Sequence, residues 1–390
     1  MRLLIAPIAV VLLTTAMMSG VRADDISAAI NVLRAVQPGA VDSAAARDAV
    51  RELTTGGSQA LLPLLRGFRD ATPLTVNWLR NAFEQIADAE TKAGRKLPQQ
   101  ELEAFVRDQN QSPFARRLVY ETLKRSDAGI EDRLIPDMLL DASPEFRRDA
   151  VALLIKEASA IPDAAKATPL YRRAFSGAVH EDQVKTIAEA LRKHNEVVDI
   201  QKHFGFLPQW SIVGPFDNKD GKGFAVACGP ELDVNASKAP DLQAEYDGQT
   251  DKVRWRPIAT TDDYGVVDIA KQIENYKGSL MYATTIWTSN RDQQAEIRLG
   301  TPNSWKLWVN GKLVFEREEY HRSSQLDQYR VPVTLKVGSN TLLFKICQNE
   351  QTQDWAQRYQ YQIRICNSTG SALLPSTSTA RSDARSGVQQ

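Results

Sequence analysis

The sequence predicts a multidomain α + β protein with a helical N-terminal part and an antiparallel β C-terminal part. Over residues 24–204, apolar residues recur every three or four positions, which is the spacing of one face of an α-helix. Over residues 205–368, apolar and polar residues alternate in short runs, which is the period of a half-buried strand. At 390 residues the chain is also too long for one comfortable core, so at least two domains are expected.

The helical part carries an internal similarity. Ser112-Pro-Phe-Ala-Arg-Arg117 and Ser143-Pro-Glu-Phe-Arg-Arg148 lie 31 residues apart, and each serine can cap a helix whose first residue is proline. Short helices at this spacing resemble a HEAT-type α-solenoid, although an irregular helical bundle has the same periodicity. The expected helix breakers are Gly56-Gly57, Thr72-Pro73, Gly94, Pro98, Gly129, Pro162 and Pro169.

The arginine pairs of this repeat, Arg116-Arg117 and Arg147-Arg148, have two interpretations. They can form a stripe that binds anions, or they can pair with neighbouring helices and helix carbonyls. The second interpretation is favoured because charges on repeat helices usually serve packing and solvation.

The clearest signal in the β part is a hairpin at Asn310-Gly311. The runs 305–309 and 312–315 alternate on either side, and Asn-Gly tolerates the positive φ angles of a type I′ turn. Further strands are expected at 210–216, 280–288, 295–300, 329–335, 341–347 and 359–366. Short strands at this spacing predict a two-sheet β-sandwich or jelly roll.

The N-terminus predicts export. Arg2 precedes an apolar run over residues 3–18, and Val21-Arg22-Ala23 places small residues at −3 and −1 of a Sec-type signal peptide, residues 1–23, cleaved after Ala23. The mature chain is then periplasmic or secreted. A retained anchor is the alternative, but the run is short for a span and contains Pro7. No later segment reaches about 18 unbroken apolar residues, so no membrane span is expected in the mature chain.

The charge balance gives no reason to expect a nucleic-acid partner. The chain has 48 basic and 48 acidic residues, and removal of Arg2 and Arg22 with the signal peptide leaves a net charge of −2. Such a balance gives no long-range attraction to phosphate or to an anionic membrane surface.

The three cysteines are Cys228, Cys347 and Cys366. In an oxidising compartment a pair is expected to bridge. If the strands that end at Cys347 and Cys366 pair, these two thiols form the predicted disulfide; two free buried thiols are the alternative. No cysteine spacing matches a zinc site, so no metal is expected.

Four segments, in order, resemble one family. They are Trp210-x-x-x-Gly214-Pro215-Phe216, Tyr282-Ala283, Arg298-Leu-Gly300 with Lys306-Leu-Trp308-Val-Asn310-Gly311, and Leu335-Lys-Val-Gly-x-Asn340-x-Leu-Leu-x-Lys345. Together they resemble the galactose-binding-like β-sandwich of exported bacterial proteins, often of planctomycete type, where it follows helical repeats. The resemblance implies a module that binds carbohydrate or only packs.

The chain departs from this family in one turn. The family carries acidic residues before its Trp-Val-Asn-Gly strand, whereas this chain has Thr301-Pro-Asn-Ser304. A calcium or ligand role at that turn is therefore not carried over. No cofactor is expected, and a structural calcium ion in the β-sandwich is the alternative that the resemblance leaves open.

The matched residues are interpreted as structural. Trp308 and Asn310 share one face of their strand, so one of the two faces must enter the core, and Trp210 and Trp308 are expected to pack there. Candidate glycan-stacking residues are instead Trp355, in a polar loop, with Tyr320 and Tyr359. The alternative is that Trp355 covers a neighbouring element.

The catalytic templates are missing from the sequence: it has no Gly-x-Ser-x-Gly elbow, no phosphate-binding glycine loop and no His-Glu-x-x-His helix. The expected function is therefore a non-enzymatic exported scaffold, whose repeats bind protein and whose β-sandwich packs or binds glycan. The first alternative is an accessory carbohydrate-binding protein for polysaccharide processing, and the second is a hydrolase. Residues 369–390 are Ser/Thr/Arg-rich and predict a disordered tail.

Overall fold

The computed structural model describes residues 22–39, 43–235 and 239–376. The predicted signal peptide, except Arg22 and Ala23, lies outside them. Within the described ranges, no helix is both long and apolar enough to cross a membrane. The chain combines helices with antiparallel sheets, which confirms the α + β class. It forms two compact units, Met1–Phe146 and Arg147–Gln390.

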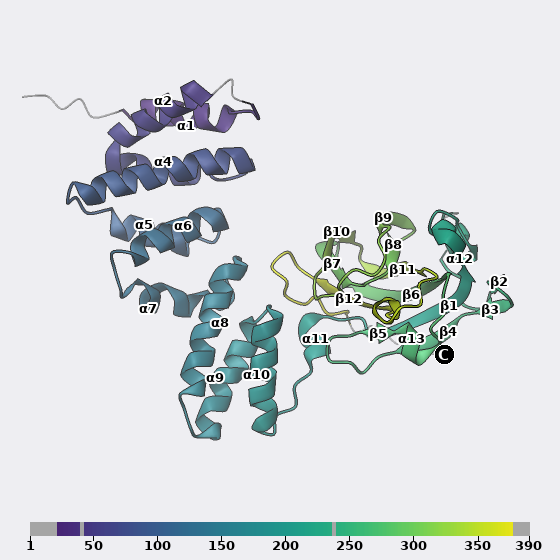
Figure 1. Cartoon of the computed structure of the whole chain (residues 1–390). Coiled ribbons are helices and arrows are strands. Elements are labelled where there is room, and N and C mark those ends of the chain that lie inside the picture. The colour runs from purple at the N-terminus through teal and green to yellow at the C-terminus, as the bar shows by residue number, and fades with distance from the viewer. Residues whose placement is uncertain (1–21, 40–42, 236–238, 377–390) are drawn as a thin grey trace, which may run out of the picture. The chain divides into compact units, whose positions relative to one another are not determined.

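The first unit is built of short helices, drawn in purple and blue in Figure 1. Thr72 and Ser112 accept hydrogen bonds from the backbone N–H groups of Thr75 (3.2 Å) and Ala115 (3.5 Å), and proline is the first residue of each helix. The predicted serine cap of the repeat at residue 112 is thus confirmed. The elements are α1 (Ala23–Ala35), α2 (Ser43–Thr55), η1 (Gly57–Ala60), α3 (Leu61–Arg66), α4 (Pro73–Lys92), α5 (Gln99–Arg107), α6 (Pro113–Lys124), α7 (Ile130–Leu134), η2 (Ile135–Met138) and the start of α8 (Pro144–Ser159).

The second unit begins inside α8 and continues with α9 (Ala164–Gly177), α10 (Glu181–Lys193) and α11 (Ile200–Phe204) before its strands. The expected breaker Pro169 lies inside α9, so that prediction was wrong. Proline there removes one N–H donor, but the helix continues on either side of it. After α11, Gly205 has φ 74°, and a Cβ at this position would lie 2.6 Å from the carbonyl oxygen of Ile365. The secondary structure thus changes near residue 205, whereas the compact unit begins at Arg147.

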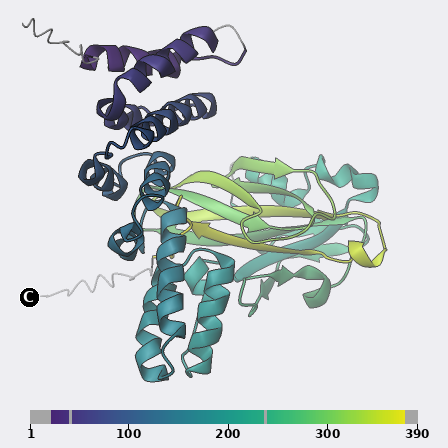
Figure 2. The ribbon, with the colours of Figure 1, turned by 60° about the vertical axis from the view of Figure 1, so that its left-hand side comes forward.

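The strands form two main antiparallel sheets, seen from two sides in Figures 1 and 2. The six-stranded sheet has the order β4 (Arg256–Ala259), β1 (Gln209–Asp217), β6 (Ser279–Ser289), β11 (Gly338–Gln348), β8 (Ser304–Val309), β9 (Lys312–Arg317). The four-stranded sheet has the order β10 (Tyr329–Leu335), β7 (Gln293–Gly300), β12 (Gln360–Cys366), β5 (Val267–Asp268). The remaining elements are the hairpin β2 (Glu245–Asp247) and β3 (Lys252–Arg254), η3 (Lys219–Phe224), α12 (Gly229–Asn235), α13 (Ile269–Gln272) and η4 (Asp354–Ala356).

The hairpin at Asn310-Gly311 is confirmed. β8 pairs with β9 through Val309 and Lys312, and the two turn residues have φ angles of 51° and 80°. The structure buries both faces of β8, because Leu307 and Val309 enter the core between the two sheets while Trp308 packs into a second cluster on the outer face. That second cluster includes Phe224 and Val234, from the segment that carries η3 and α12.

The predicted disulfide between Cys347 and Cys366 does not form. Cys347 ends a strand of the six-stranded sheet and Cys366 a strand of the four-stranded sheet, so these successive strands do not pair. All three cysteines are described, and all are free thiols. Burial raises the pKa of Cys347 to about 12, which keeps this thiol protonated.

Residues 369–376, which were predicted to belong to a disordered tail, are hydrogen-bonded to the sheets. Ala372 bridges to Cys366, and the N–H groups of Leu373 and Ser376 donate to the carbonyls of Ile365 and Thr288. These hydrogen bonds satisfy backbone groups that composition alone assigned to solvent. Residues 377–390 lie outside the described chain.

Candidate functional site

Trp355 lies on η4 and exposes 60% of its surface. Its indole meets the imidazole of His321 edge to face, with ring centroids 5.1 Å apart at 88°. The imidazole Nε2 lies 2.7 Å from the Oδ1 of Asn349. His321 itself has φ 57°, a left-handed conformation that among residues other than glycine is adopted mostly by Asn, Asp and His. An exposed indole and a fixed imidazole thus form an aromatic ledge.

The loop that carries Trp355 is held by buried polar side chains. The amide of Gln348, which is fully buried, donates to the carbonyls of Ala356 (3.2 Å) and Arg358 (3.1 Å). Lys277 Nζ also donates to the Ala356 carbonyl (2.9 Å), and the buried Asn303 amide donates to the Arg358 carbonyl (3.3 Å). Because these bonds fix the backbone at the end of η4 and just after it, the indole needs little further ordering to bind a ligand.

Two predicted partners of Trp355 have other positions. Tyr359 is fully buried in the core between the sheets, and its hydroxyl donates to the carbonyl of Ile346 (3.0 Å), so its assignment to a glycan-stacking surface was wrong. Tyr359 comes just before β12 and alternates with its core-facing residues Tyr361 and Ile363, so its ring points inward. Tyr320 is half-buried, and its hydroxyl accepts from Asn218 Nδ2 (3.1 Å). Of the three candidates, only Trp355 offers a largely exposed ring.

The turn Thr301-Pro-Asn-Ser304 supports this loop and strand β12. The Thr301 hydroxyl donates to the carbonyl of Gln360 (2.8 Å), and the Asn303 amide to the side-chain oxygen of Gln348 (3.3 Å). Across the described ranges, no group of three or more His, Cys, Asp or Glu side chains could hold a metal ion. The Thr301 hydroxyl and the Asn303 amide thus form hydrogen bonds to other groups of the protein.

The motif residues of the family resemblance are in structural positions. Trp210 is buried in the core between the sheets, and its indole N–H donates to the carbonyl of Leu207 (2.7 Å). Gly214, Pro215 and Phe216 lie in β1, where the pairing with β6 shifts register between Val213 and Phe216 and the Gly214–Pro215 bond is cis. Asn310 Nδ2 donates to the side-chain oxygen of Asn340 (2.8 Å), which joins the hairpin to β11.

Arg116 and Arg147 stand at equivalent places in two successive repeats, and both are buried. Arg116 donates to both carboxylate oxygens of Asp141 (2.8 and 2.6 Å) and to the carbonyl of Val106 (2.7 Å). Arg147 donates to the carbonyl of Gly177 (3.0 Å) and to the hydroxyls of Thr369 (3.2 Å) and Ser371 (2.7 Å). The interpretation of these arginines as internal partners is confirmed.

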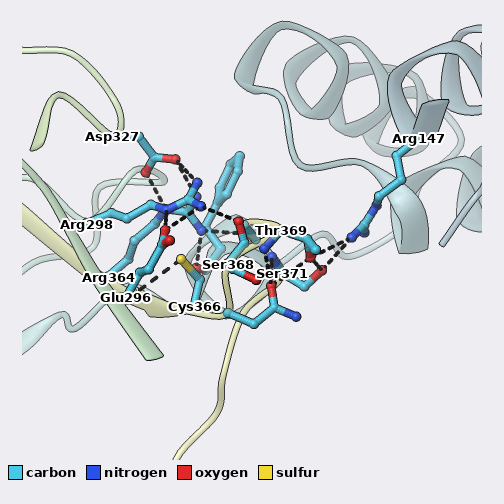
Figure 3. A network of polar contacts seen from close by, with 12 residues as sticks. Arg147, Glu296, Arg298, Asp327, Arg364, Cys366, Ser368, Thr369 and Ser371 are labelled. Atoms are coloured by element: carbon cyan, nitrogen blue, oxygen red, sulfur yellow. Dashed lines mark hydrogen bonds and ion pairs between the residues drawn. The ribbon is translucent and has the colours of Figure 1, made fainter. Parts of the chain in front are cut away.

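Figure 3 shows that Arg147 belongs to a wider polar network in the second unit. Arg298 and Arg364 face each other across β7 and β12, a like-charge pair that would repel without a counter-ion. Asp327 lies beside both, with bonds of 2.6 Å to Arg364 Nε and 2.7 Å to Arg298 Nη1. Burial alone would raise the pKa of Asp327, but Arg364 and Arg298 hold this pKa below its ordinary value. Arg364 also donates to the carbonyl of Phe204 (3.1 Å), which ties α11 to the sheet.

A second internal ion pair fastens the η3–α12 segment to the six-stranded sheet. Lys345, fully buried, donates to Glu231 Oε2 (3.0 Å) and to the carbonyls of Phe224 (3.1 Å) and Val226 (2.7 Å). The Tyr282 hydroxyl donates to the same carboxylate oxygen (2.7 Å), and burial raises the pKa of this tyrosine. Lys345 and Tyr282 are motif residues of the family resemblance, but the sequence analysis missed their common partner, Glu231. The signal available was a lysine inside an otherwise apolar strand.

The first unit carries a hollow of about 640 Å³, which we call the Phe114 hollow. Phe114 is 43% exposed there and stacks on Phe68, with ring centroids 5.9 Å apart at 25°. Ion pairs lie along its rim: Arg80 with Glu84 (2.9 Å) and Arg117 with Glu121 (2.6 Å). The full lining is Arg80, Glu84, Pro113, Phe114, Arg117, Leu118, Glu121, Arg125, Ser143, Pro144 and Glu145. An apolar floor with a charged rim is the composition of a protein-binding surface.

No family model matches the chain, and no curated protein matches it. Similar solved structures include a β-glucosidase from Kluyveromyces marxianus in complex with glucose, at 10% identity and a TM-score of 0.26, covering 40% of this chain and 16% of that one. Another is a β-glucuronidase from Ruminococcus gnavus, at 10% identity and a TM-score of 0.22, covering 42% of this chain and 28% of that one. A third is the GH31 α-xylosidase from Xanthomonas citri, at 14% identity and a TM-score of 0.20, covering 42% of this chain and 18% of that one. The chain thus spans less than a third of each of these enzymes, and TM-scores this low carry no argument about activity.

Proposed function

We propose that this chain is an exported, non-enzymatic interaction protein. In this proposal the first unit is part of a HEAT-like α-solenoid that binds a partner protein, and the sheets of the second unit form a galactose-binding-like β-sandwich. The observation that carries the proposal is the Phe114 hollow. A large aromatic side chain is left 43% exposed in a concave, mostly apolar surface, although burying the rest of it would stabilise the monomer by about 1 kcal/mol.

The arrangement of the hollow supports protein recognition. Its lining comes from α4, α6 and the start of α8, so a bound chain would contact three helices. Repeat proteins bind extended partners on such continuous surfaces. The paired charges of the rim remain hydrated in the free protein and can be re-paired with charges of a partner at modest cost.

The test is a comparison of partner capture by three forms of the mature protein. The native chain, Phe114→Ser and the control Leu140→Ser are each used to capture proteins from the exported fraction of the source cells. Leu140 is 67% exposed and does not line the hollow, so its replacement removes a similar apolar surface elsewhere. We expect specific partners with the native chain and the control, and a loss of at least tenfold with Phe114→Ser. Equal capture by all three forms would contradict the proposal.

A second function, accessory carbohydrate binding, is favoured by the ledge of Trp355 and His321. A fixed, exposed indole can stack on the apolar face of a sugar ring, and neighbouring amides can hydrogen-bond its hydroxyls. On a polysaccharide array, Trp355→Ala should abolish binding by the mature chain, while the control Val337→Ala, at a position 63% exposed, should leave it unchanged. An array without any Trp355-dependent signal would eliminate this function.

A further inference from the structure

The Phe114 hollow has a neighbour on an adjacent side of α4. This second hollow, of about 450 Å³, is the Trp78 hollow. Its lining comes from two helices, α2 and α4, and consists of Ala44, Arg47, Asp48, Val50, Arg51, Trp78, Asn81 and Gln85. Trp78 is half-buried there, so each hollow contains one partly exposed aromatic ring.

The two hollows lie beside the same two turns of α4. Trp78, Asn81 and Gln85 line one of them, while Arg80 and Glu84 line the other. Residues three and four apart share a helix face, so these two sets occupy adjacent sides of α4 at one height. The edges of the two hollows that α4 lines are therefore about one helix diameter apart, roughly 10 Å.

Each hollow also contains an exposed arginine that could meet a charged ligand. Arg47 and Arg125 are exposed, and in the described part of the chain neither forms an ion pair with a carboxylate. By contrast, Arg51 pairs with Asp48, and Arg80 with Glu84. A ligand that bears one carboxylate near each hollow would therefore complement this surface.

We propose that the occupant is an extended segment of a partner protein that crosses α4 and places one apolar side chain in each hollow. In an extended polyproline II conformation the rise is about 3.1 Å per residue, so side chains three residues apart are separated by roughly 9 Å, which matches the two hollows. An acidic residue beside each apolar one would pair with Arg47 and Arg125. This inference rests on the proposed function, since it names the chemistry of the partner at that surface.

The test uses a displayed library of random 12-residue peptides and the full mature chain. We expect the selected peptides to share two apolar residues three positions apart with adjacent acidic residues. A labelled synthetic peptide of that consensus should lose at least tenfold in affinity with Phe114→Ser and with Trp78→Ser, and should bind Leu140→Ser as it binds the native chain. Because Trp78 is half-buried, Arg47→Glu at an exposed position provides a second variant of the same hollow; it should also weaken binding, and the loss should shrink as salt is raised.

Several outcomes would overturn the inference. Selected peptides with basic residues would exclude the pairing of ligand carboxylates with Arg47 and Arg125. Apolar residues seven positions apart would indicate a helical ligand instead of an extended one. Peptide binding that depends on Phe114 but not on Trp78 or Arg47 would refute the proposal that one segment occupies both hollows. The proposed function would then remain intact. A library without any enriched peptide would refute the inference even if Phe114-dependent partners are captured.

Discussion

Arg116 and Arg147 occupy equivalent positions 31 residues apart, yet their guanidinium groups find different partners. Arg116 is neutralised within the helical repeats by the carboxylate of Asp141. Arg147 donates to hydroxyls of Thr369 and Ser371, in the segment that follows the last strand of the sheets. The comparison teaches that one repeat position can serve packing between helices in one unit and attachment of a distant chain segment in the other.

The two units also differ in where they leave aromatic side chains exposed. The first unit leaves Trp78 and Phe114 partly exposed in hollows. The second unit also leaves an aromatic side chain exposed, Trp355, but on a loop, and it buries charges in networks around Asp327 and Glu231. We infer that the first unit is built mainly for binding and that the buried charges of the second mainly fix its fold.

The largest expected effect comes from removing a buried carboxylate. Asp327→Asn leaves the fully buried Arg364 without its carboxylate partner and Arg298 with Glu296 alone, and should destabilise the second unit by about 3–5 kcal/mol. Urea unfolding followed by tryptophan fluorescence reports this unit, because Trp78 is the only tryptophan in the first unit. Asp141→Asn should cost a similar amount in the first unit, seen by circular dichroism at 222 nm. If Asp327→Asn left the fluorescence transition unchanged, the network would not hold the second unit.

A smaller effect is expected for the attachment by Arg147. Arg147→Met removes hydrogen bonds to Thr369, Ser371 and the carbonyl of Gly177, which should cost about 1–3 kcal/mol. Amide hydrogen exchange should rise in residues 366–376. The control Arg148→Met removes only a surface pair with Asp182 and should change stability by less than about 1 kcal/mol. Equal exchange in both variants would contradict a specific role for Arg147.

Much of the fold followed from the sequence, because period and turn chemistry are local properties. The Asn310-Gly311 turn and the strands around it could be placed from neighbouring residues alone. The site was harder to predict, because burial depends on partners far along the chain. Tyr359 was assigned to a surface because it follows the polar loop of Trp355, but it shares the inward face of Tyr361 and Ile363. Cys347 was paired with Cys366 because consecutive strands often pair, but β11 and β12 lie in different sheets.

The Arg298–Asp327–Arg364 network could not be derived from spacing. Only the register of β7 against β12 reveals that two arginines face each other and need a carboxylate. A charged residue at alternate positions of a predicted strand was the one available hint, and it is equally typical of a solvated sheet face.

The smallest effect concerns pH. Burial lowers the pKa of His203 below its ordinary value of 6.5, and Arg364 and Arg147 act in the same direction. The unfolded chain therefore binds this proton more readily than the folded one, so this contribution to stability is complete above pH 6.5 and is lost as the pH falls through the folded pKa. Urea midpoints of the second unit should fall below pH 6.5, and His203→Gln should flatten that dependence. An unchanged slope in the variant would assign the acid sensitivity to other groups.

The most direct test of the contrast between the units is hydrogen exchange of the mature chain with and without the library-selected peptide. The account predicts protection in α2, α4 and α6 and unchanged exchange in β7 and β12. Protection confined to the sheets, with none on α4, would contradict it.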